Sequence, residues 1–134
     1  MITASVVTYH TKAEELNSCL KNLNHKLIKR VYVVDNSNQK YIEEICQKFA
    51  YVEYIASDNI GYGAANNIAI KKAIGKNSKY HLVINSDISF DKEVIDKLYS
   101  YMDNNTDVAQ AQPKIVYPNG ELQYLCKLLP TPMD

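Results

Sequence analysis

The sequence of 134 residues has few of the features that mark nucleic-acid-binding proteins. Arg30 is its only arginine, so bidentate arginine clamps on phosphate must be scarce. Lysine plus arginine number 15 and aspartate plus glutamate number 15, which leaves no formal net charge. A protein whose main partner is nucleic acid usually carries a basic excess, so we expect no such partner. Any phosphate would be held by backbone amides, lysines or a metal.

Long apolar runs and targeting signals are also missing. No stretch approaches the roughly 20 apolar residues of a membrane-spanning helix. The first five residues lack the basic start of a secretory signal, so we expect a cytoplasmic protein, with peripheral attachment to the inner face of the membrane left open. Cys19, Cys46 and Cys126 form no CxxC pair or Cys/His metal spacing, and we expect buried free thiols.

Strand-like and helix-like segments alternate along the chain. The hydrophobic pattern predicts strands at 2–8, 30–35, 51–56, 80–84 and 108–117, and helices at 12–25 and around 42–49, 66–75 and 94–101. Pro113 makes part of the last strand an edge or a bend. This order predicts an α/β three-layer sandwich with a mainly parallel sheet and right-handed crossovers. The length suits one domain, 1–134.

Polar clusters follow the predicted strands, where ligands of parallel sheets bind. Because the carboxyl ends of parallel strands lie along one edge of a sheet, we expect these clusters to lie near one another. The four clusters are Thr8-Tyr9-His10, Asp35-Asn36-Ser37, the segment 58–63, and Asn85-Ser86-Asp87.

The two acidic clusters each allow two interpretations. Asp87 could hold a hard divalent cation against phosphate oxygens, or it could cap the following helix, a role for which Asp91 also competes. Asp35 could accept a hydrogen bond from the ring N–H of a base, or it could bond locally to Ser37 or Asn38.

The other two clusters suggest stacking and phosphate contacts. Tyr9 could stack on a base, and His10 could carry a proton or be a plain surface residue. Gly61 and Gly63 do not fit the dinucleotide fingerprint, because the third glycine position is Asn66. A glycine-rich turn before a helix can still present amides to phosphate, although a simple tight turn explains it too.

Together these segments resemble the inverting glycosyltransferases of family 2, in particular the rhamnosyltransferase-like branch. Five motifs occur in the order and spacing of that family, and the resemblance covers nearly the whole chain. They are VTYH at 7–10, VVDNS at 33–37, NIGYGAANN at 59–67, LVINSD at 82–87 and PKIVYPNG at 113–120.

The resemblance implies a GT-A-like (Rossmann-like) fold and a nucleoside diphosphate sugar donor, dTDP- or UDP-linked. It implies transfer of the sugar to a saccharide acceptor in cell-surface polysaccharide synthesis. Asp35 would recognise the base, and Asp87 would hold a weakly bound Mg²⁺ or Mn²⁺. The full set expected at the nucleotide sugar is Thr8, Tyr9, His10, Asp35, Asn36, Asn59, Gly61, Gly63, Asn67, Asn85 and Ser86.

The sequence departs from the family pattern at three places. His10 stands where asparagine is common, and Asn85 replaces the first acid of the DXD-type motif. The catalytic base and the acceptor half are expected beyond Asp134, so we expect a donor-binding half. The alternative is an inactive nucleotide-binding or self-associating module, with homo-oligomer formation, left by truncation. A nucleotidyltransferase-like enzyme is disfavoured, because residues 10–13 form no glycine-rich phosphate loop.

Overall fold

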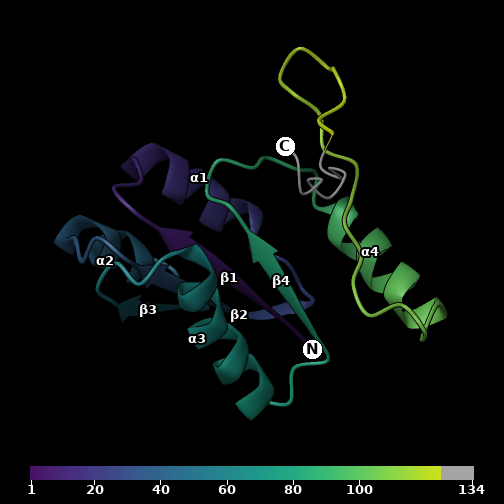
Figure 1. Cartoon of the computed structure of the whole chain (residues 1–134), viewed down its shortest axis with the longest axis horizontal. Coiled ribbons are helices and arrows are strands. Elements are labelled where there is room, and N and C mark those ends of the chain that lie inside the picture. Colours follow the sequence, from purple (N-terminus) through teal and green to yellow (C-terminus); the bar gives the residue numbers. More distant parts are fainter. Residues whose placement is uncertain (125–134) are drawn as a thin grey trace, which may run out of the picture. The chain divides into compact units, whose positions relative to one another are not determined.

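The computed structural model describes residues 1–124 and divides into two compact units (Figure 1). Met1–Glu93 forms the first unit, and the second begins at Val94. No helix within the described part of the chain is long and apolar enough to cross a membrane.

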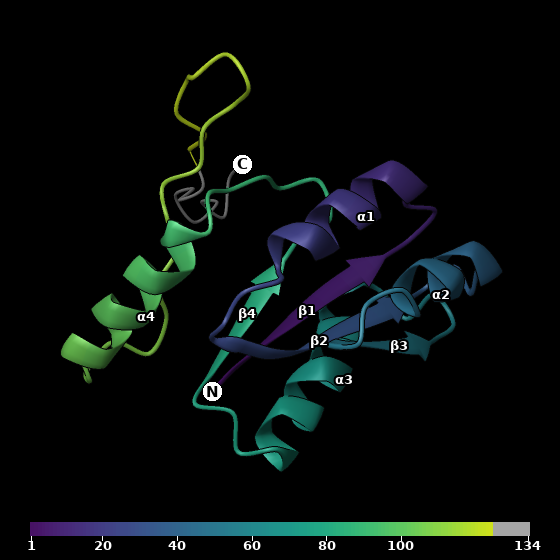
Figure 2. The same ribbon diagram turned by 180° about the vertical axis from the view of Figure 1, so that it is seen from behind.

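The first unit is a parallel sheet with helices on both faces. Its four strands lie in the order β3-β2-β1-β4, and every neighbouring pair is parallel. Figures 1 and 2 show α3 on one face of the sheet and α1 and α2 on the other. The elements are β1 (Ile2–Thr8), α1 (Ala13–Asn22), β2 (Ile28–Asp35), α2 (Lys40–Cys46), β3 (Val52–Ala56), α3 (Tyr62–Gly75) and β4 (Tyr80–Ile84).

The core forms around the two central strands. β1 and β2 are buried along most of their length, as expected for strands that helices cover on both faces. On α1, Leu16, Cys19 and Leu20 are buried at spacings of three and one, which gives that helix one apolar face. The predicted alternation of strands and helices is therefore confirmed through β4. The cysteine prediction is confirmed for Cys19 and Cys46, both buried and free, whereas Cys126 lies outside the described residues.

Helix α3 begins about four residues earlier than the sequence pattern predicts. Gly61 precedes its first turn with φ of 85°, a left-handed conformation that glycine adopts at no steric cost. The asparagine at 66 costs the helix little, because Ser5 Oγ donates to Asn66 Oδ1 at 2.8 Å and Asn66 Nδ2 donates to the Tyr62 carbonyl at 3.1 Å. Ala65 and Ala69 pack against Tyr32 and Val34 of β2, so the helix lies directly on the sheet.

A network of hydrogen-bonded polar side chains lies beneath α3. The ring of His81, on β4, bridges two hydroxyls of β1: Nδ1 lies 2.8 Å from Thr3 Oγ1 and Nε2 lies 3.0 Å from Ser5 Oγ. Because Ser5 donates its proton to Asn66, the Ser5 oxygen accepts from His81 Nε2–H. Burial lowers the pKa of His81 to about 4, so the ring is neutral at pH 7.

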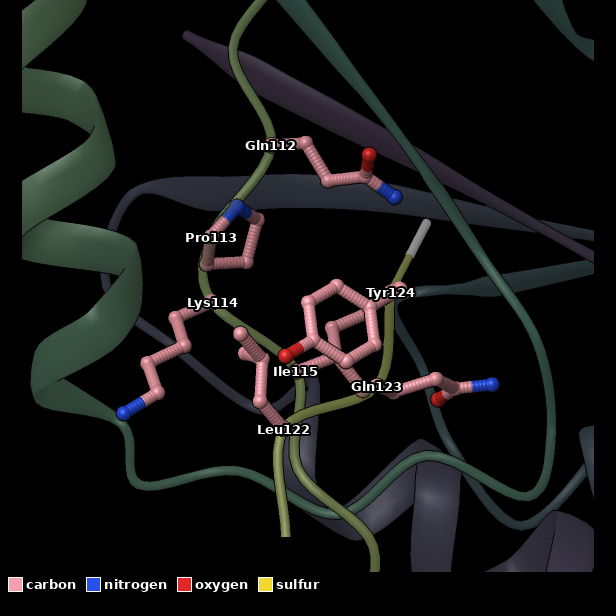
Figure 3. Close-up of a pocket in the computed structure, with 7 residues that line it drawn as sticks. All are labelled: Gln112, Pro113, Lys114, Ile115, Leu122, Gln123 and Tyr124. Carbon is pink, nitrogen blue, oxygen red and sulfur yellow. The ribbon is translucent and has the colours of Figure 1, made fainter. Parts of the chain in front are cut away.

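The second unit contains α4 (Glu93–Asn104) and a small hairpin. Gln123 N–H donates to the Ile115 carbonyl at 2.9 Å, and Gly120, with φ of 85°, closes the turn that the sequence indicated. The hairpin borders an open pocket of about 350 Å³ (Figure 3). Its lining consists of Gln112, Pro113, Lys114, Ile115, Leu122, Gln123 and Tyr124.

The predicted fifth strand at 108–117 is wrong. Within residues 1–124 this segment makes only one isolated antiparallel bridge, between Val116 and Leu122. Its pairing is local to the hairpin, and Pro113 has no N–H to give to a longer ladder.

The neutral ring of His81 makes stability depend on pH. In the unfolded chain a histidine titrates near 6.5, so between about pH 6.5 and 4 the unfolded state binds a proton that the folded state does not. We expect the free energy of unfolding to fall on acidification through this window, by up to about 1.4 kcal/mol per pH unit. Urea unfolding of the wild type and of His81→Gln at pH 7, 5.5 and 4.5 measures this. An equal pH slope for both proteins would contradict the assignment.

Candidate functional site

The carboxyl edge of the sheet brings the expected clusters into one region. Thr8, Asp35 and Ala56 are paired across β1, β2 and β3 at their last residues. Two backbone hydrogen bonds continue beyond the strand ends: Asn36 N–H donates to the Thr8 carbonyl at 2.9 Å, and Ser57 N–H donates to the Asp35 carbonyl at 3.0 Å. The expectation that strand ends gather these segments is confirmed.

The carboxylate of Asp35 is fully buried and already accepts five hydrogen bonds. Oδ1 accepts from Ser37 Oγ at 2.6 Å, Ser37 N at 3.0 Å and Thr8 Oγ1 at 3.0 Å. Oδ2 accepts from Gln39 N at 2.7 Å and Tyr54 Oη at 3.3 Å. The local bonding to Ser37 is therefore present, with Gln39 in the place expected for Asn38. Whether Asp35 also recognises a base stays a prediction.

These bonds determine the charge of Asp35. Burial on its own raises the pKa of the carboxyl, but the hydrogen bonds from Ser37, Gln39 and Thr8 outweigh burial and lower it below the ordinary value. The group is thus a carboxylate at neutral pH.

Beside this satisfied carboxylate lie two amide oxygens that have no partner in the described residues. Asn36 is only 5% exposed, and its Oδ1 is buried without a hydrogen bond. The same holds for Oε1 of Gln39. The sequence pattern predicts Asn36 as a site residue but gives no signal for Gln39, because Gln39 lies outside the motifs and only the folded turn buries its oxygen.

The Thr8-Tyr9-His10 cluster divides into a structural residue and two exposed ones. Thr8 is buried and donates to Asp35, whereas Tyr9 is 56% exposed. The rings of Tyr9 and His10 meet edge to face, with centroids 4.4 Å apart. His10 has a left-handed φ of 50°, and its ring Nδ1 accepts from Gln39 Nε2 at 3.1 Å. The loops after β1 and β2 are therefore linked to each other.

The start of α3 presents exposed polar groups. Asn59, Gly61, Gly63 and Asn67 are all exposed, and Asn59 Oδ1 accepts from Gly61 N–H at 3.4 Å. The first turn of α3 contains no acidic residue, so no side chain of that turn offsets the positive end of the helix dipole. These residues could meet an anionic group, although their binding role stays a prediction.

The Asn85-Ser86-Asp87 loop after β4 is held by side chains from two helices. Tyr62 Oη, at the start of α3, donates to Asn85 Oδ1 at 2.7 Å. Ser86 Oγ donates to Glu15 Oε1 of α1 at 2.6 Å. The sequence contains no signal for Tyr62 or Glu15 in this role, because each lies more than 20 residues away from the residue that it contacts.

Asp87 is exposed, as a cation ligand at this edge would need to be. Burial, reinforced by the carboxylates of Glu15 and Asp87, raises the pKa of the nearby Cys19 to about 12. Within residues 1–124 no group of three or more histidine, cysteine or acidic side chains could hold a metal ion. A cation at Asp87 would thus need ligand oxygens from a bound phosphate, and it stays a prediction.

Asp35 should be a main contributor to stability, because Asn at this position places a donor against donors. We expect Asp35→Asn to lower the free energy of unfolding by about 2–3 kcal/mol at pH 7. Because the folded pKa is lowered, this contribution is present above the unfolded value of about 3.9 and is lost as the pH falls below it. Urea unfolding at pH 7 and at about pH 2 tests both points, with the exposed Asp58→Asn as control. Equal stability of the two variants would refute the prediction.

Comparison with known proteins identifies one family. Residues 4–131 match the family described as Glycosyl transferase family 2. The uncharacterized glycosyltransferase MJ1057 of Methanocaldococcus jannaschii is 28% identical over 116 residues, which cover 81% of this chain and 39% of that protein. Rhamnosyltransferase WbbL of Escherichia coli K12 is 30% identical over 92 residues, which cover 62% of this chain and 33% of that protein.

The chain thus spans about a third to two fifths of the length of these curated relatives. The crystal structure of S. aureus TarS 1-349 superposes with a TM-score of 0.60 at 22% identity, over 78% of this chain and 33% of that one. This similarity confirms the GT-A-like α/β fold. With a family match over almost its whole length, the chain belongs to glycosyl transferase family 2.

Proposed function

We propose that the chain binds a nucleoside diphosphate sugar at the carboxyl edge of its sheet, as the donor-binding part of a glycosyltransferase. Membership of family 2 supports this, since the family in general implies a nucleotide-sugar donor and a saccharide acceptor. The donor would be dTDP- or UDP-linked, and the product a cell-surface polysaccharide. The catalytic base and the acceptor site belong to the complete enzyme, and we assign them to none of residues 1–124.

The observation that carries the proposal is the unpartnered oxygen of Asn36. A buried polar group without a hydrogen bond costs about 1–3 kcal/mol, so natural proteins keep few of them. This one lies beside the end of β2, where ligands of parallel sheets bind. A ring N–H of a pyrimidine base would satisfy it. Because both oxygens of Asp35 are filled, we assign acceptance of the base N–H to Asn36, with Asp35 shaping the turn.

The neighbouring groups fit the remainder of a nucleotide sugar. The exposed ring of Tyr9 offers a face on which a base could stack. The amides that follow Gly61 lie at the positive end of α3, which favours a diphosphate. Asp87 would hold a divalent cation against the same diphosphate, and a bound cation would offset the charge that develops on the leaving group.

Loss of the Asn36 oxygen should weaken nucleotide binding without weakening the fold. We expect Asn36→Ala to reduce the affinity for UDP or dTDP about tenfold, since one hydrogen bond is lost. The free energy of unfolding should change little, because this oxygen has no hydrogen-bond partner within residues 1–124. Isothermal titration with UDP, dTDP and GDP in the presence of Mn²⁺ or Mg²⁺, combined with urea unfolding, measures both.

Asn24→Ala is the matched control, because Asn24 is exposed and lies before β2, at the opposite end of the sheet. If no nucleoside diphosphate binds the wild type at millimolar concentration, the proposed function fails. If Asn36→Ala binds as the wild type does, the base assignment fails alone. A tight dimer with no nucleotide affinity would favour the self-associating module instead.

Removal of the Asp87 carboxylate should abolish the part of binding that depends on a cation. We expect Asp87→Ala to bind the nucleoside diphosphate equally with Mn²⁺ and with EDTA, because Asp87 is the exposed carboxylate of the cluster Asn85-Ser86-Asp87 that directly follows β4. Asp107→Ala serves as the control, because Asp107 is an exposed acid outside the four polar clusters. Persistence of the wild-type Mn²⁺ effect in Asp87→Ala would show that the cation is held elsewhere.

A further inference from the structure

Within residues 1–124, the side chain of Asn85 has its two N–H donors free for a ligand, whereas its oxygen is already engaged. An asparagine amide offers one oxygen acceptor and two N–H donors. The hydroxyl of Tyr62 occupies the oxygen at 2.7 Å, while the residue as a whole is exposed at the sheet edge. The Nδ2 group, with two N–H donors, is the part of the amide that keeps its full capacity for a ligand, because the oxygen already uses one of its two lone pairs.

A donor at this position cannot replace the acid whose place it takes. Mg²⁺, Mn²⁺ and other hard cations bind oxygen ligands, which an N–H group does not supply. An N–H group instead pairs with an anionic oxygen, and a hydrogen bond to a charged acceptor is stronger than one between neutral groups. The two free N–H donors of Asn85 thus match phosphate and not a metal ion.

On the basis of the proposed function, we propose that Asn85 Nδ2 donates a hydrogen bond directly to an oxygen of the donor diphosphate, and that Tyr62 is the positioning residue that fixes this orientation. Asp87 is then the only member of the loop that can serve the cation. Nucleotide binding should depend only partly on a divalent ion, because a neutral donor meets some of the phosphate charge.

The loop is braced so that the donor is ready before a ligand arrives. Tyr62 holds Asn85 from α3, and Glu15 holds the next residue, Ser86, from α1. Since these helices cover opposite faces of the sheet, the loop is restrained from both sides (Figures 1 and 2). An amide held in one orientation loses little rotational freedom on binding, which favours affinity.

A carboxylate at position 85 should make nucleotide binding depend strongly on a divalent cation. In Asn85→Asp the side chain would repel a diphosphate when no cation is present, since two negative groups would face each other. With Mn²⁺ the same carboxylate would supply a second oxygen ligand beside Asp87. The substitution would therefore convert weak cation dependence into strong dependence.

Isothermal titration with UDP or dTDP, whichever the wild type binds more tightly, tests the proposal in EDTA and in Mn²⁺. In EDTA we expect affinity to fall about tenfold in Asn85→Ala and about threefold to tenfold in Tyr62→Phe. Asn85→Asp should lose roughly tenfold or more in EDTA and recover in Mn²⁺. Tyr101→Phe is the matched control, because Tyr62 and Tyr101 are both 50% exposed, and it should bind as the wild type does.

The double variant Tyr62→Phe/Asn85→Ala shows whether Tyr62 acts by positioning Asn85 or by contacting the ligand itself. If Tyr62 acts through Asn85, Tyr62→Phe has no further effect once Asn85 is alanine, whereas additive losses would overturn its positioning role. Loss of affinity in Asn85→Ala only when Mn²⁺ is present would show that Asn85 serves the cation, and unchanged affinity in both buffers would show no contact. If the wild type binds no nucleoside diphosphate, the proposed function fails as well; if it binds and only these variants behave otherwise, the inference alone fails.

Discussion

The buried carboxylate of Asp35 is the interaction on which the edge of the sheet depends. It accepts hydrogen bonds from the end of β1, from the turn after β2 and from β3, so three segments share one charge. Such a charge is costly to bury unless it is fully bonded, and five donors meet that requirement. The rest of the edge is arranged around it: the turn that satisfies Asp35 also buries the side chain of Asn36 beside it.

This arrangement separates residues that build the edge from residues that are free to bind. The hydroxyls of Thr8 and Ser37 both donate hydrogen bonds to the carboxylate of Asp35, so these three residues stabilise the edge itself. Asn36 and Gln39 each have a buried oxygen that no group in the described part of the chain bonds, and Tyr9 has an exposed ring. A structural triad of this kind can hold its neighbours in place before a ligand arrives, which is what an edge built for recognition needs.

The sequence predicted the first unit well, because its signals are local. Strands β1 and β4 have the predicted bounds, since their apolar runs end abruptly in polar residues. The start of α3 lies earlier than the pattern predicts, because Asn66 is bonded in the helix by Ser5 of β1, 61 residues away. The prediction of a strand at 108–117 is wrong because β propensity alone does not supply a partner strand.

The candidate site could likewise be predicted only where its signals are local in the sequence. The four clusters could be found because each directly follows a strand or opens a helix. The roles of Tyr62, Glu15 and Gln39 could not, because they arise from contacts across 23, 71 and 29 residues. The folded turn also determines which oxygens of Asp35 and Asn36 already accept a hydrogen bond, and a sequence pattern does not contain this information.

The buried thiols of Cys19 and Cys46 have a practical consequence. Burial, with nearby carboxylates adding to it, raises the pKa of each to about 12, so neither forms the reactive thiolate in the folded chain. An alkylating reagent would reach them only when α1 or α2 opens. In a chain whose Cys126 is replaced, their rates of modification would report local opening of the two helices on one face of the sheet, without any added label.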